Sequence, residues 1–199
     1  MALITPKNIP AANALTGSLP QTTFIDSMPA GHIIQVKHAI DTQIITINAQ
    51  GWTDILTNTM TPLGTNSNFL IRANIATNTS DDTDVSGDNP YPLGKFMRSV
   101  ASGAYTDADN LNGYNRTPTH HFDPAPYRTG DGVGFRYRTR HSSVLVEDDP
   151  AYTLGNTITY KLRIYISGDG IQIGCPEGYG GDSAYGGMPT QLTVYEIKV

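Results

Sequence analysis

The sequence predicts an all-β protein, a β-sandwich or jelly-roll-like domain with an extended N-terminal arm. In residues 157–166, TITYKLRIYI, apolar side chains occupy every second position, as on a strand with one buried face. The chain of 199 residues also holds 20 Gly and 13 Pro, which suits short strands joined by tight turns. No segment shows a convincing helical period of about 3.6 residues. Short strands separated by turn signals favour a sandwich or jelly roll.

The first 30 residues show no sustained period, and their prolines exclude a helix or a central strand across most of the segment. Alone, such a segment would not fold. We therefore expect residues 1–30 to be an anchoring arm held against a neighbouring chain, and residues 31–199 to be the β-sandwich domain. The anchoring side chains would be Ile4, Pro6, Ile9, Pro10 and Leu15.

After the arm, alternating patterns indicate about seven or eight strands. The last is ambiguous, because Leu192 and Val194 lie on one face and Tyr195 and Ile197 on the other. Residues 93–104 are the one weak helical candidate. The expected strands cover residues 32–40, 43–52, 67–77, 132–140, 142–148, 157–166, 171–173 and 191–199.

Two long polar stretches, residues 76–92 and 105–131, interrupt the strands. Loops of this length in a compact domain usually carry function or contacts. A third, Gly-rich loop spans residues 176–188, where tyrosine rings would supply contact area at low entropic cost. We expect receptor or surface contacts at His120, His121, Tyr127, Tyr179 and Tyr185.

The segment DDTDVSGD, residues 81–88, has the spacing of a calcium loop of the EF-hand kind. A bidentate Glu is missing, because Leu93 stands at position 12 of that loop. The alternative is a solvated acidic turn, and we expect no metal there. Histidines 120 and 121 would also need a further ligand, such as His141, to hold a metal. The residues at the calcium-loop positions are Asp82, Asp84, Ser86, Gly87 and Asp88.

Three arginines, Arg136, Arg138 and Arg140, lie on one face of the strand expected at residues 132–140. A guanidinium group suits carboxylate or phosphate. The more ordinary outcome is pairing with acidic residues such as Asp148, or across subunits. Together with Tyr165, these arginines are expected at an intersubunit contact.

Composition and motifs exclude several classes of protein. A formal net charge of −5 argues against nucleic-acid binding. The single Cys175 excludes an intrachain disulfide framework. The sequence has no GxSxG, HExxH or P-loop motif, so we expect no catalysis and no cofactor. There is no signal-peptide pattern and no apolar run of about 18 residues. We therefore expect synthesis in a cytoplasm and no membrane contact.

Two regions resemble a domain found in fibre and other virion proteins of tailed phages, especially those of aquatic hosts, cyanophages among them. In residues 31–78, a Gly-led β-branched strand is followed by Trp52-Thr53-Asp54 and by the turn Thr61-Pro62. In residues 150–199, TITYKLRIY is similar to the family's TYK strand, and QLTVYEIKV to its closing strand. ALTGSLP, residues 14–20, is similar to the family's lead-in.

The resemblance implies a trimeric β-sandwich in a virion appendage, with no catalytic residues to transfer. We therefore expect a non-enzymatic virion structural protein, a short fibre or spike or a capsid-decorating protein, with a surface or host-recognition role. Its partners would be further copies of itself, other virion proteins through the arm, and a cell-surface glycan. Two alternatives stay open: a calcium-assisted carbohydrate-binding module and, with no defined catalytic set, a glycan-degrading enzyme.

Overall fold

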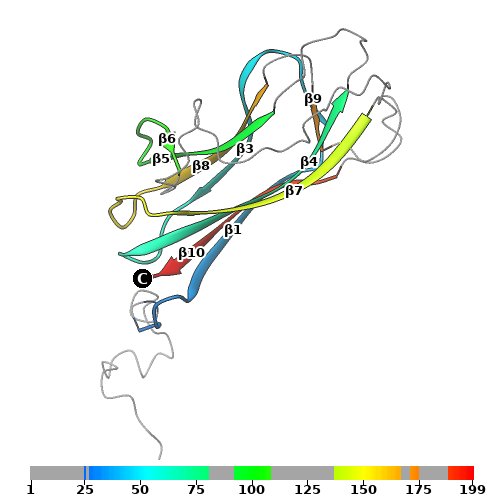
Figure 1. Ribbon diagram of the computed structural model, residues 1–199. Coiled ribbons are helices and arrows are strands. Elements are labelled where there is room, and N and C mark those ends of the chain that lie inside the picture. The colour runs from blue at the N-terminus through cyan, green and yellow to red at the C-terminus, as the bar shows by residue number, and fades with distance from the viewer. Residues whose placement is uncertain (1–24, 26, 81–91, 109–136, 167–170, 175–187) are drawn as a thin grey trace, which may run out of the picture.

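The structure is a computed structural model that describes residues 25, 27–80, 92–108, 137–166, 171–174 and 188–199. Within these residues, ten strands form two sheets packed face to face (Figure 1). The expected β-sandwich is confirmed. The strands are β1 (Ile33–Asp41), β2 (Ile45–Ile47), β3 (Gly51–Met60), β4 (Ser67–Ser80), β5 (Leu93–Val100), β6 (Thr106–Asp107), β7 (Tyr137–Asp148), β8 (Ile158–Ile166), β9 (Ile171–Ile173) and β10 (Thr190–Lys198).

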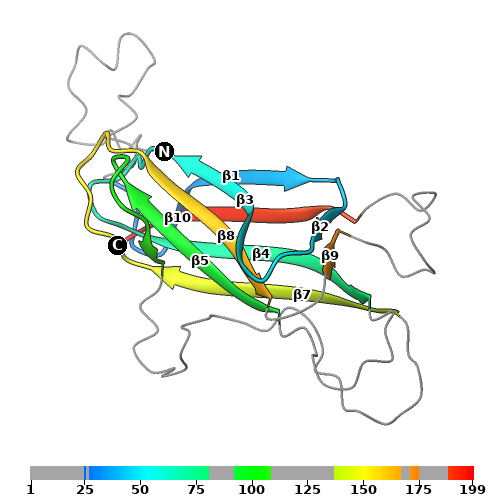
Figure 2. The ribbon, with the colours of Figure 1, turned by 90° about the horizontal axis from the view of Figure 1, so that it is seen from above.

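The connectivity is that of a jelly roll. The six-stranded sheet has the order β1-β10-β4-β9-β2, with β7 on the other side of β4, and the four-stranded sheet has the order β3-β8-β5-β6. All pairings are antiparallel. The chain passes repeatedly from one sheet to the other, and the last strand returns beside the first, as in a double Greek key. Figure 2 shows β5 and β8 crossing over β10, β4 and β7.

The core lies between the sheets and follows from the alternation of the strands. Every second residue of β8, from Ile158 to Ile166, is buried. Leu192 and Val194 of β10 also face inward, so the inward face of this strand is no longer ambiguous. Each such side chain contributes about 1.5–3 kcal/mol on burial. Among the described residues, there is no helix with the length and hydropathy needed to span a bilayer.

The structure corrects the expected helical candidate at residues 93–104. Leu93–Val100 is strand β5, paired with β8 on one side and β6 on the other. Tertiary pairing outweighs a weak local pattern. The strand ends in a turn, where Ala101 and Ser102 have φ of 50° and 62°.

Other strand boundaries also differ from expectation. Residues 43–52 are not one strand, because Gly51 has φ of 128° where the chain leaves β2 in one sheet and enters β3 in the other. A positive φ of this kind favours glycine. Residues 76–80 belong to β4, not to a loop. The two strands expected at residues 132–140 and 142–148 are one continuous strand over residues 137–148, β7, and residues 132–136 lie outside the described residues.

A fully buried carboxylate, that of Glu196 on β10, fastens the connection between β3 and β4 to the sheet. It accepts hydrogen bonds from the backbone N–H groups of Leu63 (3.0 Å) and Gly64 (2.8 Å) and from Ser67 Oγ (2.9 Å). Gln35 Nε2 on β1 donates to it at 3.0 Å. A charged acceptor strengthens such hydrogen bonds. Through them, the side chain of Glu196 links β1, β10 and the turn that contains Thr61-Pro62.

A second buried carboxylate connects the two sheets. Asp148 on β7 is 1% exposed, and it accepts hydrogen bonds from Arg98 on β5 and from Tyr160 Oη at 2.9 Å. Burial raises the pKa of Tyr160, and the Asp148 charge raises it further. The phenol therefore stays protonated and keeps donating to the carboxylate.

The role of Glu196 is tested by Glu196→Gln. In this variant the side-chain NH₂ group must face either Gln35 Nε2 or the backbone N–H groups of Leu63 and Gly64. All of these are donors, so none can accept a hydrogen bond from it. We expect a loss of about 1–3 kcal/mol in the free energy of unfolding, because a buried donor is left unsatisfied. Chemical denaturation at fixed protein concentration measures this change. Asp149→Asn, at an exposed position, is the control; equal stability of both variants would contradict the assigned role.

Candidate functional site

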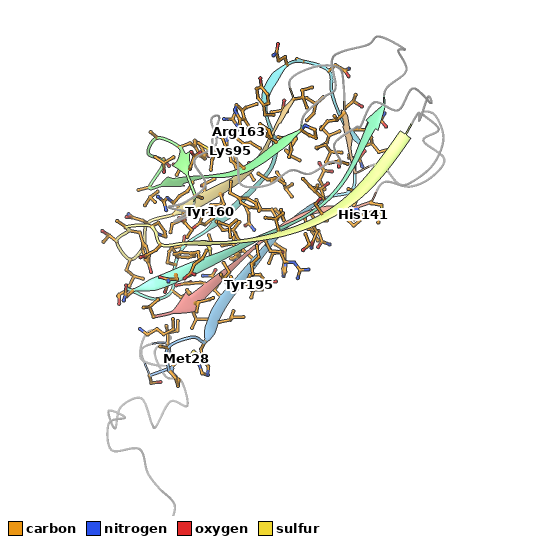
Figure 3. All side chains as sticks on the ribbon, viewed as in Figure 1. Met28, Lys95, His141, Tyr160, Arg163 and Tyr195 are labelled. Carbon is orange, nitrogen blue, oxygen red and sulfur yellow. The ribbon has the colours of Figure 1, made fainter. Side chains whose placement is uncertain are left out.

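The outer face of the six-stranded sheet, named the open face from here on, exposes apolar side chains. Directly opposed residues of paired strands point to the same side, and Val36, Tyr195 and Leu70 oppose one another across β1, β10 and β4. Tyr195 lies on the side of the sheet away from Tyr160, which lies between the sheets (Figure 3). The most exposed apolar residues of the open face are Ile33 (54%), Val36 (39%), Ile40 (58%) and Leu145 (58%).

Two opposite charges, Arg72 on β4 and Glu147 on β7, lie on the same face. Arg72 Nε donates to Ser143 Oγ at 3.2 Å, and Glu147 Oε1 accepts from Asn68 Nδ2 at 2.8 Å. Among the described residues, neither charge forms an ion pair. Each is therefore held in place by a neutral side chain and keeps its charge open to solvent.

A shallow hollow lies at one end of the open face, where β4, β7 and the start of β10 meet. Its volume is about 310 Å³, at the lower limit for pockets that hold small ligands. Asn74 Nδ2 donates to Gln191 Oε1 at 3.3 Å across its floor. His141, labelled in Figure 3, and Ser143 line one side, and Met188 lines another. The lining mixes polar side chains with apolar ones such as Met188 and Pro189, and His141 is its one ionisable side chain.

The outer face of the four-stranded sheet carries an aromatic pair. Trp52 on β3 and Tyr165 on β8 are opposed in the strand pairing, and their ring centroids are 5.5 Å apart. Lys95 Nζ lies 4.6 Å from the Trp52 ring centroid and 3.1 Å from Asp107 Oδ1. The ammonium group thus bridges a ring and a carboxylate within one chain.

Two ion pairs lie on the same outer face. Asp54 Oδ2 accepts from Lys161 Nζ at 2.5 Å, and Asp54 Oδ1 lies 2.6 Å from Arg163 Nε. The Arg163 Nε–H is not aligned to donate, so this second contact is ionic without a hydrogen bond. Lys161 Nζ also lies 4.4 Å from the Tyr105 ring centroid. Figure 3 shows Lys95 and Arg163 on this side of the molecule.

The network shifts two pKa values. Burial raises the pKa of Asp54, but the hydrogen bond from Lys161 and the charges of Arg163 and Lys161 outweigh it, so the pKa lies below its ordinary value. The hydrogen bond to Asp54 raises the pKa of Lys161, against a smaller lowering by burial. Both groups are therefore charged near neutral pH.

Of the residues expected to make contacts, Tyr165 is the one whose side chain the structure describes. It lies in the aromatic pair on the outer face of the four-stranded sheet. Arg138 and Arg140 are strand residues of β7 whose side chains are not described. Asp148, considered as a partner for the arginine row, binds Arg98. The other expected residues lie outside the described part: the arm residues Ile4, Pro6, Ile9, Pro10 and Leu15, the contacts His120, His121, Tyr127, Tyr179 and Tyr185, Arg136, and the candidate calcium loop.

Sequence reasoning missed the open face as a site. One signal was available: residues 191–199 are apolar on both sides of the strand, which is unusual for a sheet with one face in water. No group of three or more His, Cys, Asp or Glu within the described segments could hold a metal ion.

No model of a known protein family matches the chain, and no curated protein matches it in sequence. The resemblance to virion proteins of tailed phages therefore remains a prediction, which rests on the motifs quoted above.

The ion pair at Asp54 predicts a pH-dependent contribution to stability. A carboxyl group whose pKa is lowered by folding stabilises the folded state above its ordinary pKa, and the contribution is lost as the pH falls through the lowered pKa. Because solvent screens this pair, we expect Asp54→Asn to cost about 0.2–1 kcal/mol at pH 7.

The difference between wild type and Asp54→Asn should close as the solution becomes more acidic than the ordinary Asp pKa of about 3.9. Thermal unfolding across this pH range measures it, with Asp149→Asn as the control. A difference that stays constant with pH would show that the charge of Asp54 is not what stabilises the face.

Proposed function

We propose that this chain is a structural protein of a tailed-phage virion, a short trimeric fibre or spike or a capsid-decorating protein without catalytic activity. The observation that supports assembly of the chain with itself is the set of exposed apolar residues on the open face. They leave apolar side chains in water at both edges of this face, and apolar surface of this kind favours contact with a partner. The motifs that resemble those of virion proteins, in roughly residues 30–75 and 150–199, support a place in a virion.

The two sheets differ in a way that supports this role. The outer face of the four-stranded sheet carries ion pairs and ring contacts within the chain, such as Asp54 with Lys161. Among the described residues, the open face has hydrogen bonds between polar side chains, such as His38 with Thr193, but no ion pair and no ring contact. The buried carboxylates of Glu196 and Asp148 are both used in bonds that hold the fold together. Buried carboxylates that serve to hold the fold together are consistent with a structural protein.

The proposed anchor is the arm, residues 1–30, which would bind other virion proteins. The backbone N–H of Gly31 donates to Lys198 O at 2.7 Å, and that of Lys198 donates to His32 O at 2.9 Å. The first residues of the domain are therefore bonded to the end of β10, so the arm would leave the domain at a defined point of the six-stranded sheet. In this proposal the long loops carry recognition of a cell-surface glycan.

A second candidate function is a calcium-assisted carbohydrate-binding module. The observation that favours it is the pair Trp52–Tyr165 on the outer face of the four-stranded sheet, since aromatic rings at a surface suit sugar contact. Its calcium would have to bind at residues 82–88, outside the described part. This function predicts a single chain that responds to calcium.

Light scattering behind size exclusion, with and without chelator, separates the two functions. The virion proposal predicts a mass near three times 21.5 kDa that does not change with chelator. A single-chain mass at every concentration would contradict the trimer. A single-chain mass combined with heat on calcium titration, lost in Asp84→Ala, would favour the carbohydrate-binding module.

A further inference from the structure

We infer that the open face is the surface through which copies of this chain contact one another, and that Arg72 of one copy pairs with Glu147 of the next. The inference rests on the proposed assembly of the chain with itself, and it names the face and the charges that would make that assembly specific. It does not depend on the virion or on a glycan.

The pairing of β4 with β7 sets the two charges diagonally. Arg72 is directly opposite Leu145, and Leu70 is directly opposite Glu147. Arg72 bonds to Ser143, beyond Leu145 on one side, whereas Glu147 bonds to Asn68, beyond Leu70 on the other. The two side chains therefore turn away from each other, although a diagonal pair of long side chains is within reach.

Both edges of the open face are apolar. Ile33, Val36 and Ile40 lie on β1 at one edge, and Leu145 lies on β7 at the other. In a closed ring of copies, one edge of each copy meets the opposite edge of its neighbour. Such a ring covers β1 of one copy with β7 of the next, which removes apolar surface from water on both sides.

The charges favour a second copy over a different partner. A surface that recognises a strongly acidic or basic partner carries mainly the opposite sign. Within the described residues, the open face instead carries one exposed arginine, Arg72, and one exposed carboxylate, Glu147, besides the histidines His38 and His141. A face with both signs complements itself when a rotation brings the cation of one copy to the anion of the next. A stable interface buries about 800 Å² per partner, so the whole sheet face would take part.

Charge reversal tests the pair. Arg72→Glu and Glu147→Arg would each bring like charges together between copies, and we expect each variant to dissociate at concentrations at least tenfold higher than wild type. The double variant should recover the wild-type mass, measured by light scattering over a dilution series.

Mixing the two single variants separates contact between chains from contact within one chain. If the pair forms between copies, an equimolar mixture assembles into mixed species, because most junctions then join opposite charges. If the pair forms within one chain, the double variant recovers and the mixture does not, which would overturn the inference. Native mass spectrometry of the mixture, with one variant isotope-labelled, gives the composition.

A matched apolar pair of variants tests the face itself. Leu145 is 58% exposed on the open face, and Leu154 is 43% exposed in the connection before β8. Leu145→Ser should raise the dissociation constant at least tenfold, whereas Leu154→Ser should leave it unchanged. Circular dichroism shows whether the dissociated variants are still folded.

The outcomes are distinguishable. If wild type forms a trimer and Arg72→Glu, Glu147→Arg and Leu145→Ser all form it equally well, the open face is not the contact, and the proposed trimer stands without this inference. If wild type is a single chain at every concentration, the trimer of the proposed function fails, and the inference fails with it.

Discussion

One constraint governs the structure: the six-stranded sheet carries apolar side chains on both faces, and the second sheet covers one of them. β10 shows this most clearly, since Leu192 and Val194 are buried in the core, whereas Tyr195 and Ile197 point the other way. Apolar surface left in water is unfavourable in free energy. The outer face of the four-stranded sheet carries ion pairs, whereas the open face exposes apolar side chains. Contacts within the chain satisfy the side chains of one outer face but leave apolar side chains of the other in water. This contrast is the reason to expect that a second copy covers the open face.

The buried carboxylates fix which residues form the open face. Because side chains alternate, a slip of one residue would exchange the two faces of a strand. Glu196 prevents this for β10, since its carboxylate is held by Leu63 and Gly64 and cannot move one position without losing these bonds. A Cβ at Gly64 would lie 2.5 Å from Ser67 Oγ, so a larger residue there would displace the hydroxyl that donates to Glu196. Tyr195, the next residue along, is thereby held on the open face. Stability and assembly are thus connected through one strand.

Part of this structure could be predicted from the sequence, for identifiable reasons. β8 could be, because its alternation is complete and it is central in its sheet. β5 could not, since residues 93–100 mix Gly94, Phe96 and Ser99 in a pattern that only pairing with β8 makes a strand. The inward side of β1 could not either: Gln35 and Lys37 face the core side at an open sheet edge, whereas Val36 and Ile40 face solvent. The loop residues expected to carry recognition lie outside the described part, so the predicted contacts there stay predictions. The open face arises only when β1, β10, β4 and β7 are side by side, so the two-sided apolar pattern of residues 191–199 indicates such a face without giving its extent.

The most direct test is a crystal structure of the protein grown from a fraction whose mass in solution has been measured. The account predicts that Ile33, Val36, Ile40 and Leu145, now 54%, 39%, 58% and 58% exposed, become buried between copies. It also predicts that an Arg72 guanidinium lies within about 4 Å of a Glu147 carboxylate of the neighbouring copy, the separation of an ion pair. An assembly of the same mass that leaves these side chains in solvent and joins its copies through another face would contradict the account.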